Sequence, residues 1–142
     1  MSTLRFIRSS KGFTLIETMV IVAILGVLLG LTIPAFGNYI ARQKVIGART
    51  ELMADLQYAR SLAIARRTTF RIDFTASDYQ LILPGPDDVI RQRTAPDGVT
   101  FNADTNPNFY PWGLSDACNI QVGNFKITST VSLLPNGSVS HD

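Results

Sequence analysis

The feature that most constrains the fold of this chain is an apolar run that contains one carboxylate. Residues 13–36 read FTLIETMVIVAILGVLLGLTIPAF, and Glu17 is the only charged residue among them. As an α-helix with a rise of about 1.5 Å per residue, this segment would be about 36 Å long, enough to cross a bilayer. A carboxylate in such a segment is energetically costly, so the presence of Glu17 requires an explanation.

The residues on either side of the run predict how it is oriented. Arg5, Arg8 and Lys11 precede it without any acidic residue, which favours a cytoplasmic N-terminus. Arg42 and Lys44 follow the run and oppose this orientation, but the leader is the first segment presented to the insertion machinery. A secretory signal peptide would have a shorter apolar region and a small-residue cleavage site after it, so we expect this segment to stay as a single-pass anchor with the head outside the cytoplasm.

The residues around Glu17 form a recognisable signal. Lys11-Gly12-Phe13-Thr14-Leu15-Ile16-Glu17, followed by the apolar run and Pro34, resembles the class III signal of type IV pilins and type II secretion pseudopilins. The resemblance implies that residues 1–12 are a leader, cut by a prepilin peptidase between Gly12 and Phe13, and that the amine of Phe13 is then methylated. It also implies that Glu17 meets the amine of a neighbouring subunit during assembly, and that Pro34 kinks or loosens the helix. The alternative is an ordinary anchor with a glutamate near the headgroups.

Residues 37–67 are predicted to continue the helix with an amphipathic character. Apolar residues recur at three- and four-residue steps, which marks one face of a helix: Val45, Ala48, Leu52, Leu56, Ala59 and Ala63. Four arginines fall within about 20° of one another beside this face, and we call them the arginine row: Arg42, Arg49, Arg60 and Arg67. Three interpretations are open for the row: a solvated flank, a contact with neighbouring subunits or acidic lipid of the inner membrane, and a nucleic-acid groove.

Residues 68–142 are predicted to form an antiparallel β-rich head. The period changes from 3.6 to 2 after Arg67, and strands are predicted over 70–74, 79–83, 89–94, 99–102, 120–127 and 131–134. The segment 103–118 is rich in Asn, Asp, Pro and Gly and contains Phe109, Tyr110 and Trp112. We expect it to be a long loop whose aromatic side chains fold back onto the core, with a presented binding surface as the alternative.

Two further motifs narrow the resemblance. The end of the predicted helix reads Leu56-Gln57-Tyr58-Ala59-Arg60-Ser61-Leu62-Ala63-Ile64-Ala65-Arg66-Arg67, and a late turn reads Leu134-Pro135-Asn136-Gly137. Both are similar to segments of the GspH/FimT family. The resemblance implies an α+β, pilin-like fold, in which a long N-terminal helix, transmembrane and then amphipathic, packs on an antiparallel head.

Little in the sequence favours catalysis. His141 is the only histidine and lies one residue from the end, where we expect a frayed terminus, and Cys118 is the only cysteine and is predicted to be a small buried side chain. We therefore expect no metal site, no cofactor and no enzyme activity.

The sequence leaves two functions to compare. The first is a minor pilin or minor pseudopilin that joins other pilins or pseudopilins in a filament. The second is a DNA-binding minor pilin, since some FimT members bind DNA through a basic C-terminal G-R-x-R motif. Here the matching segment, 137–142, has no arginine, and residues 73–142 carry three basic residues against eight aspartates, a net charge of −5. That charge disfavours binding to phosphates.

Overall fold

The structure, a computed structural model, describes residues 12–85 and 88–142, and the side chains of these residues except 31–35. The predicted leader lies outside the described residues apart from Gly12, and so does the Pro34 side chain. The described chain divides into two compact units, Met1–Gly37 and Asn38–Asp142, and each is described by itself.

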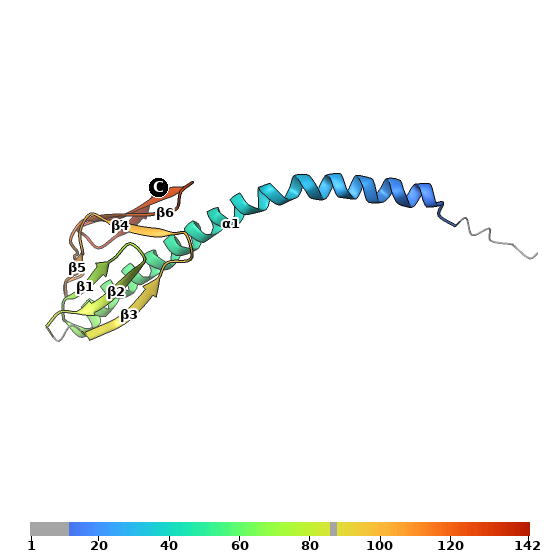
Figure 1. The fold of residues 1–142 in the computed structure, drawn as a ribbon. Helices are drawn as coiled ribbons and strands as arrows, with labels where there is room; N and C mark the ends of the chain where they lie inside the picture. Colours follow the sequence, from blue (N-terminus) through green and yellow to red (C-terminus); the bar gives the residue numbers. More distant parts are fainter. Residues whose placement is uncertain (1–11, 86–87) are drawn as a thin grey trace, which may run out of the picture. The chain divides into compact units, whose positions relative to one another are not determined.

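The chain begins with one long helix, α1 (Leu15–Arg66), whose backbone is helical through Pro34 and Gly37 (Figure 1). A search of the described residues finds no helix that meets the combined length and apolarity of a membrane span. The span that the sequence predicts over 13–36 includes residues 31–35, whose side chains are outside the description, and it remains a prediction.

The second unit contains two antiparallel four-stranded sheets. The first sheet has the order β3-β2-β1-β5, formed by β1 (Phe70–Phe74), β2 (Asp78–Leu83), β3 (Asp88–Thr94) and β5 (Asn108–Phe109). The second has the order β4-β6-β7-β8, formed by β4 (Thr100–Ala103), β6 (Cys118–Gly123), β7 (Thr128–Leu133) and β8 (Val139–His141). The predicted α+β fold is therefore confirmed.

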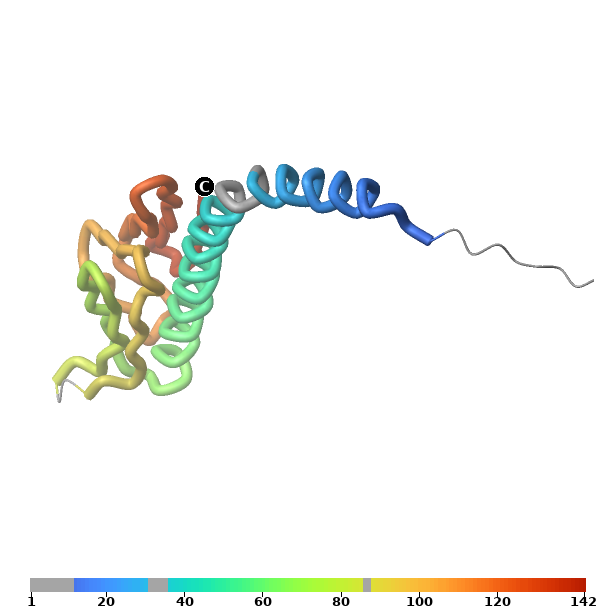
Figure 2. Tube along the Cα trace, turned by 45° about the vertical axis from the view of Figure 1, so that its right-hand side comes forward, coloured from blue at the N-terminus to red at the C-terminus, as the bar shows by residue number. Residues whose placement is uncertain are grey.

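The core of the second unit lies between α1 and the two sheets. All six residues of the predicted apolar helix face are buried, with at most 3% exposure. They pack with strand residues of both sheets, including Phe70, Phe109, Ile120 and Val131. Figure 2 shows the strands gathered along one side of this part of the helix. Burial of one amphipathic stripe thus fixes which side of α1 faces the head.

Two strands, β5 and β8, were not predicted from the sequence, and β5 also breaks the sequential order of a meander. β5 lies inside the segment predicted as a loop and pairs with β1, so that the chain returns to the first sheet after β4 has joined the second. β8 pairs with β7 and places His141 opposite Val131, so the prediction of a frayed terminus at His141 is wrong. Both strands are only two or three residues long, too short for a period of two to be visible.

Candidate functional site

Glu17 lies in the first turn of α1 and takes part in capping the N-terminal end of the helix. Thr14 precedes the helix, and its Oγ1 accepts a hydrogen bond from the backbone N–H of Glu17 at 3.3 Å. A threonine followed three residues later by glutamate is a capping-box sequence, and a carboxylate in the first turn also interacts favourably with the helix dipole. Glu17 is exposed, so its carboxylate is accessible to another molecule.

Residues 12–30 of the first unit present an almost entirely apolar exposed surface. Its large apolar side chains are between 42% and 78% exposed, from Phe13 and Leu15 through Leu28 and Leu29. Exposed apolar surface on this scale marks a contact with lipid or protein. Among residues 12–30, Glu17 is the only acidic or basic residue.

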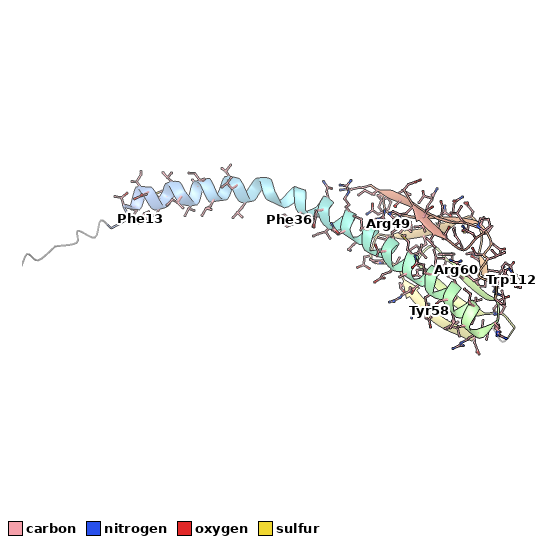
Figure 3. The ribbon with its side chains drawn as sticks, turned by 180° about the vertical axis from the view of Figure 1, so that it is seen from behind. Phe13, Phe36, Arg49, Tyr58, Arg60 and Trp112 are labelled. Carbon is pink, nitrogen blue, oxygen red and sulfur yellow. The ribbon has the colours of Figure 1, made fainter. Side chains whose placement is uncertain are left out.

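The arginine row does not act as one surface. Arg42 and Arg67 are exposed, whereas Arg49 and Arg60 are half-buried against the head (Figure 3). The Arg49 Nη1 donates to Ser129 Oγ at 3.2 Å, and the Arg60 Nε donates to the carbonyl oxygen of Gly113 at 2.9 Å. These two residues are therefore held by hydrogen bonds to their own chain, and the interpretation of the row as an intermolecular contact stays a prediction.

Arg60 lies where two glycine turns meet. Gly113 and Gly137 have φ of 83° and 75°, and both approach the Arg60 side chain. A Cβ added at Gly137 would lie 2.5 Å from the Gly113 carbonyl oxygen and 2.6 Å from Arg60 Nε. The two sequence motifs that resemble GspH/FimT segments are residues 56–67 at the helix end and residues 134–137 in the late turn. They therefore meet at this contact.

Arg67 ends the helix. Its φ is 51°, in the left-handed region, and the helix closes with Thr68 N donating to Ala63 O and Arg67 N donating to Ile64 O. This pair of bonds is a Schellman motif, in which glycine is the usual residue at the position that Arg67 occupies. Arg67 therefore has a role in terminating the helix before β1.

Asp55 is a buried carboxylate that the sequence analysis did not single out. It is 4% exposed and lies on α1, where the Tyr79 hydroxyl donates to its Oδ2 at 2.9 Å. Arg91 and Arg93 of β3 form ion pairs with its two oxygens at 2.5 and 3.2 Å. The Arg91 guanidinium also lies 4.3 Å from the centre of the Tyr58 ring. These contacts join the helix to β2 and β3.

The environment of this carboxylate changes the acidity of its neighbours. Burial, reinforced by the negative charge and hydrogen bond of Asp55, raises the pKa of Tyr79 well above its ordinary value. The hydrogen bond and charge of Asp55 also raise the pKa of Arg93. Tyr79 and Arg93 therefore stay protonated and continue to donate to Asp55 across the physiological pH range.

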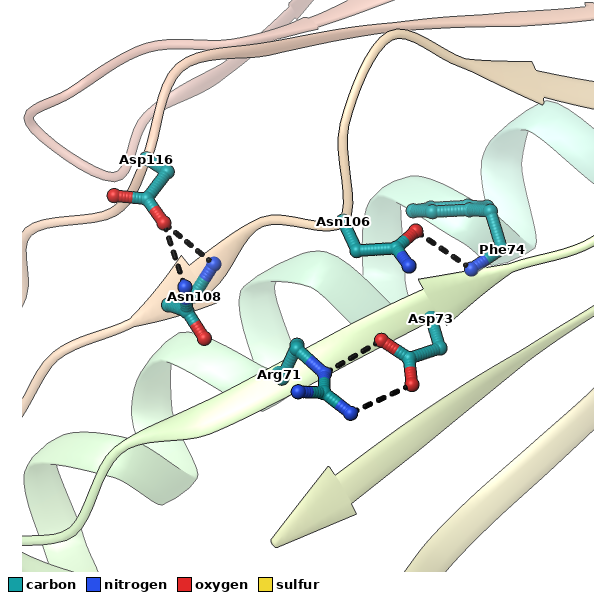
Figure 4. Close-up of polar contacts among 6 residues, drawn as sticks. All are labelled: Arg71, Asp73, Phe74, Asn106, Asn108 and Asp116. Carbon is teal, nitrogen blue, oxygen red and sulfur yellow. Dashed lines mark hydrogen bonds and ion pairs between the residues drawn. The ribbon is translucent and has the colours of Figure 1, made fainter. Parts of the chain in front are cut away.

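The segment 103–118 is held closely to the first sheet (Figure 4). The Phe74 N–H donates to Asn106 Oδ1 at 3.0 Å, while Asn108 donates to Asp116 Oδ2 from its backbone and side-chain nitrogens at 3.1 and 2.8 Å. Phe109 is fully buried, as expected for an aromatic residue folded onto the core. Trp112 is different, because it is 68% exposed and stacks on Tyr110 with 5.2 Å between ring centres.

The last two predictions concern Cys118 and metal binding. Cys118 is buried, as predicted, and its thiol lies 3.1 Å from the carbonyl oxygen of Thr105. Within residues 12–85 and 88–142, no group of three or more His, Cys, Asp or Glu side chains is placed to hold a metal ion.

Comparison with protein-family models identifies two matches. The model described as type II transport protein GspH matches residues 48–140, and the prokaryotic N-terminal methylation motif matches residues 7–33. Among curated proteins, a fimbrial protein of Pseudomonas aeruginosa is 40% identical over 73 residues, which are 51% of this chain and 47% of that protein. A fimbrial protein of Moraxella nonliquefaciens is 37% identical over 67 residues, 42% of this chain and 44% of that protein. The chain thus spans about half the length of the curated relatives it matches.

Two solved structures share the fold. The type IV minor pilin FimU of Pseudomonas aeruginosa superposes with a TM-score of 0.62 at 17% identity, over 71% of this chain and 90% of that chain. The minor pseudopilin EpsH from the type 2 secretion system of Vibrio cholerae superposes with a TM-score of 0.60 at 9% identity, over 70% of this chain and 96% of that chain. None of these matches is described as an enzyme, and none supports the DNA-binding alternative.

The family model covers most of the described second unit, including the helix end, Arg60 and the Gly137 turn, and the methylation motif covers Gly12, Phe13 and Glu17. The chain therefore belongs to the GspH family of type II transport proteins and has the pilin-like fold.

Proposed function

We propose that this GspH-family chain is a minor pilin or minor pseudopilin. It is inserted in the bacterial inner membrane through residues 13–36, with the N-terminus in the cytoplasm and the head in the periplasm. A prepilin peptidase cuts between Gly12 and Phe13, and the new amine of Phe13 is methylated. The processed chain then assembles with other pilins or pseudopilins into a type IV pilus or a type II secretion pseudopilus.

The observation that carries this proposal is the exposed apolar surface around Glu17. Side chains such as Ile16, Val20 and Leu28 are 51% or more exposed, and burying each against lipid or a neighbouring helix would contribute about 1.5–3 kcal/mol. Such a surface is suited to two successive environments, the bilayer and the packed helices of a filament. The methylation motif and the filament proteins among the relatives support the same assignment.

Glu17 gives the packed helices a register. In a low-dielectric setting, a carboxylate gains strongly from an amine at hydrogen-bond distance, although desolvation of both charges offsets much of the gain. The processed Phe13 of a neighbouring subunit supplies such an amine. A buried carboxylate without this partner would be strongly destabilising, so the pairing selects one alignment of neighbouring helices. Pro34, in this proposal, loosens the helix where the apolar segment ends.

The first experiment is mass spectrometry of the mature N-terminus in cells that contain a prepilin peptidase. The expected mass is that of a chain beginning at Phe13 and carrying one additional methyl group. A chain that retains residues 1–12 in those cells would refute the proposal.

The second experiment tests Glu17 directly. We expect Glu17→Ala to leave cleavage unchanged and to reduce the recovery of the chain in sheared filaments by at least about tenfold, the equivalent of 1.4 kcal/mol of lost pairing. Glu51→Ala is the matched control, because Glu51 is an exposed carboxylate on the same helix within the second unit. Equal recovery of the two variants would contradict the role of Glu17.

A further inference from the structure

The β6–β7 turn holds an aromatic side chain fully exposed to solvent. Phe125 is 104% exposed, the highest value among the exposed large apolar residues. Burial of a phenylalanine side chain is worth about 1.5–3 kcal/mol, so its exposure leaves a favourable contact unmade. A partner surface is therefore indicated at the tip of this turn.

Hydrogen bonds close the turn and connect it to the helix. Asn124 Oδ1 accepts hydrogen bonds from the backbone N–H groups of Lys126 and Ile127 at 2.9 and 3.0 Å, which close the turn. The Asn124 Nδ2 donates to the carbonyl oxygen of Ala41 on α1 at 3.0 Å. The ammonium group of Lys126 donates to Asn38 Oδ1. Phe125 is thus presented from a fixed position beside the first turns of the second unit's part of α1.

The surroundings of Phe125 combine aromatic, apolar and positive groups. Tyr39 and Ile40 are 60% and 52% exposed, and an open groove is lined by Asn38, Tyr39, Arg42, Lys126 and Ile127. The two segments that form this surface, 38–44 and 124–127, contain Arg42, Lys44 and Lys126 and no acidic residue. Lys44 Nζ donates to the carbonyl oxygen of Asp97 and does not line the groove. Arg42 and Lys126 line the groove, and Lys126 is also hydrogen-bonded to Asn38 there.

The position of this surface in the sequence indicates which partner it can contact. Asn38 follows the proposed membrane segment, 13–36, by only two residues. If residues 13–36 span the bilayer, as proposed above, the residues that follow them emerge at the level where acyl chains give way to headgroups. Aromatic rings and long basic side chains are the groups that favour this interface, and anionic headgroups attract each cation.

We propose that Phe125, Tyr39, Arg42 and Lys126 form a membrane-contact site that docks the head on anionic phospholipid before assembly. Phe125 enters the boundary between headgroups and acyl chains, and Arg42 and Lys126 bind a lipid phosphate in the groove between them. The contact fixes the head beside its anchor while the subunit waits in the bilayer. This inference rests on the proposed function, because it requires residues 13–36 to lie in the membrane.

The test uses the full chain in vesicles, with tryptophan as the probe. Trp112 is the only tryptophan, so Phe125→Trp combined with Trp112→Phe gives a single reporter at the turn, and the unchanged chain gives the control. Trp112 is next to Gly113, where an added Cβ would lie 3.3 Å from Ile64 Cδ1, and Ile64 is about 35 Å along the helix from Ala41. In vesicles of phosphatidylcholine and phosphatidylglycerol with brominated acyl chains, we expect the reporter at position 125 to lose most of its emission. The emission of Trp112 in the control should be unaffected.

The cations are tested in the reporter chain. Arg42→Gln and Lys126→Gln should each lower the ratio of docked to undocked heads about fivefold, which corresponds to about 1 kcal/mol per cation near an anionic surface. Vesicles of phosphatidylcholine alone should have a similar effect.

The outcomes separate the inference from the proposed function. Sedimentation of the chain with the vesicles reports the anchor, and quenching reports the docked head. A chain that sediments with vesicles while its position-125 reporter stays unquenched would overturn the docking site alone. Quenching that is weak at a high ratio of protein to lipid and increases on dilution would assign the surface to a second copy of the chain. Quenching that does not depend on lipid charge would overturn the role of the cations. A chain that does not sediment at all would refute both.

Discussion

At the scale of single residues, Gly137 shows how a turn late in the chain is fitted to the helix. Its backbone has a left-handed φ of 75°. It also lies so close to Arg60 and to the Gly113 carbonyl group that a residue with a Cβ atom would clash with both. The Arg60 guanidinium group needs this space, because its hydrogen bond to Gly113 is made between the two turns.

We therefore predict that Gly137→Ala lowers the free energy of unfolding by about 2–4 kcal/mol, through left-handed strain and overpacking together. Gly98→Ala is the matched control, since Gly98 has a φ of 81° and no heavy atom within 4 Å of an added Cβ. The control should lose only about 1–2 kcal/mol. Thermal unfolding of the detergent-solubilised chain measures both variants, and equal losses would show that the close approach of Gly137 to Gly113 and Arg60 has no energetic role.

Asp116 gives a pH-dependent contribution to stability. Burial raises its pKa, but the hydrogen bonds donated by Asn108 and by the Tyr110 hydroxyl outweigh burial, so the pKa is lowered from its ordinary value of 3.8. A carboxyl group whose pKa is lowered on folding stabilises the fold above its unfolded-state pKa, and this stabilisation is lost as the pH falls through the folded-state pKa.

Asp116→Asn is therefore expected to lower the unfolding temperature at pH 7, with a difference from the unchanged chain that shrinks as the pH falls below about 4. Asp104→Asn, a change of an exposed carboxylate in the same segment, should show a smaller effect at pH 7. A difference between Asp116→Asn and the unchanged chain that stays constant from pH 7 to pH 3 would argue against this role of the carboxylate.

At the scale of elements, α1 is stopped by backbone geometry at Arg67. A residue with a side chain in the left-handed conformation is strained by about 1–2 kcal/mol relative to glycine. The Schellman bonds of Thr68 and Arg67 maintain this conformation, because they satisfy carbonyl groups at the end of the helix.

Replacing the strained residue should accordingly stabilise the protein. Arg67→Gly is predicted to raise the free energy of unfolding by about 1 kcal/mol. Arg66→Gly, one residue earlier and still helical, should lower it by about 1 kcal/mol. Thermal melts of the two variants provide the comparison, and destabilisation by Arg67→Gly would reveal an interaction of the arginine side chain that outweighs the backbone strain.

The second contact between elements, at Asp55, depends more on hydrogen bonding than on charge. Its arginine partners are 37% and 45% exposed, so solvent screens both ion pairs and their contribution approaches that of surface pairs. The Tyr79 hydroxyl is buried, and loss of its acceptor would leave an unsatisfied donor in the core. Asp55 therefore specifies where β2 meets the helix.

At the scale of the whole molecule, the two units differ in what covers their apolar groups. The second unit encloses its own core, whereas the large apolar side chains of the first unit, from Phe13 to Leu29, are exposed. The difference suggests that the head folds without the N-terminal segment and that this segment needs lipid or neighbouring subunits.

We predict that a fragment of residues 38–142 remains folded and monomeric without detergent, while the full chain associates when detergent is removed. Analytical ultracentrifugation and circular dichroism measure association and folding. A fragment that unfolds, or a full chain that stays monomeric without detergent, would contradict this division of roles.

The local patterns of the sequence determined the helix, its buried face and most of the strands. Helical and strand periods appear directly in the order of residues such as Leu52, Leu56, Phe70 and Ile72, and the structure buries all four. The signal around Gly12, Phe13 and Glu17 is likewise continuous in sequence, and it agrees with the matched methylation motif.

Only the tertiary structure decided which side chains meet. Arg60 and Gly113 are 53 residues apart, and no short pattern specifies that Arg60 faces the chain's own turns while Arg42 faces solvent. The sequence also does not show that β4 joins the second sheet while β5 returns to the first. Pairing of such short strands depends on hydrogen bonds to backbone groups that are distant in sequence. Periodicity reports how a residue lies relative to its own element, whereas contacts between elements follow from the packing of the whole core and the pairing of its buried polar groups.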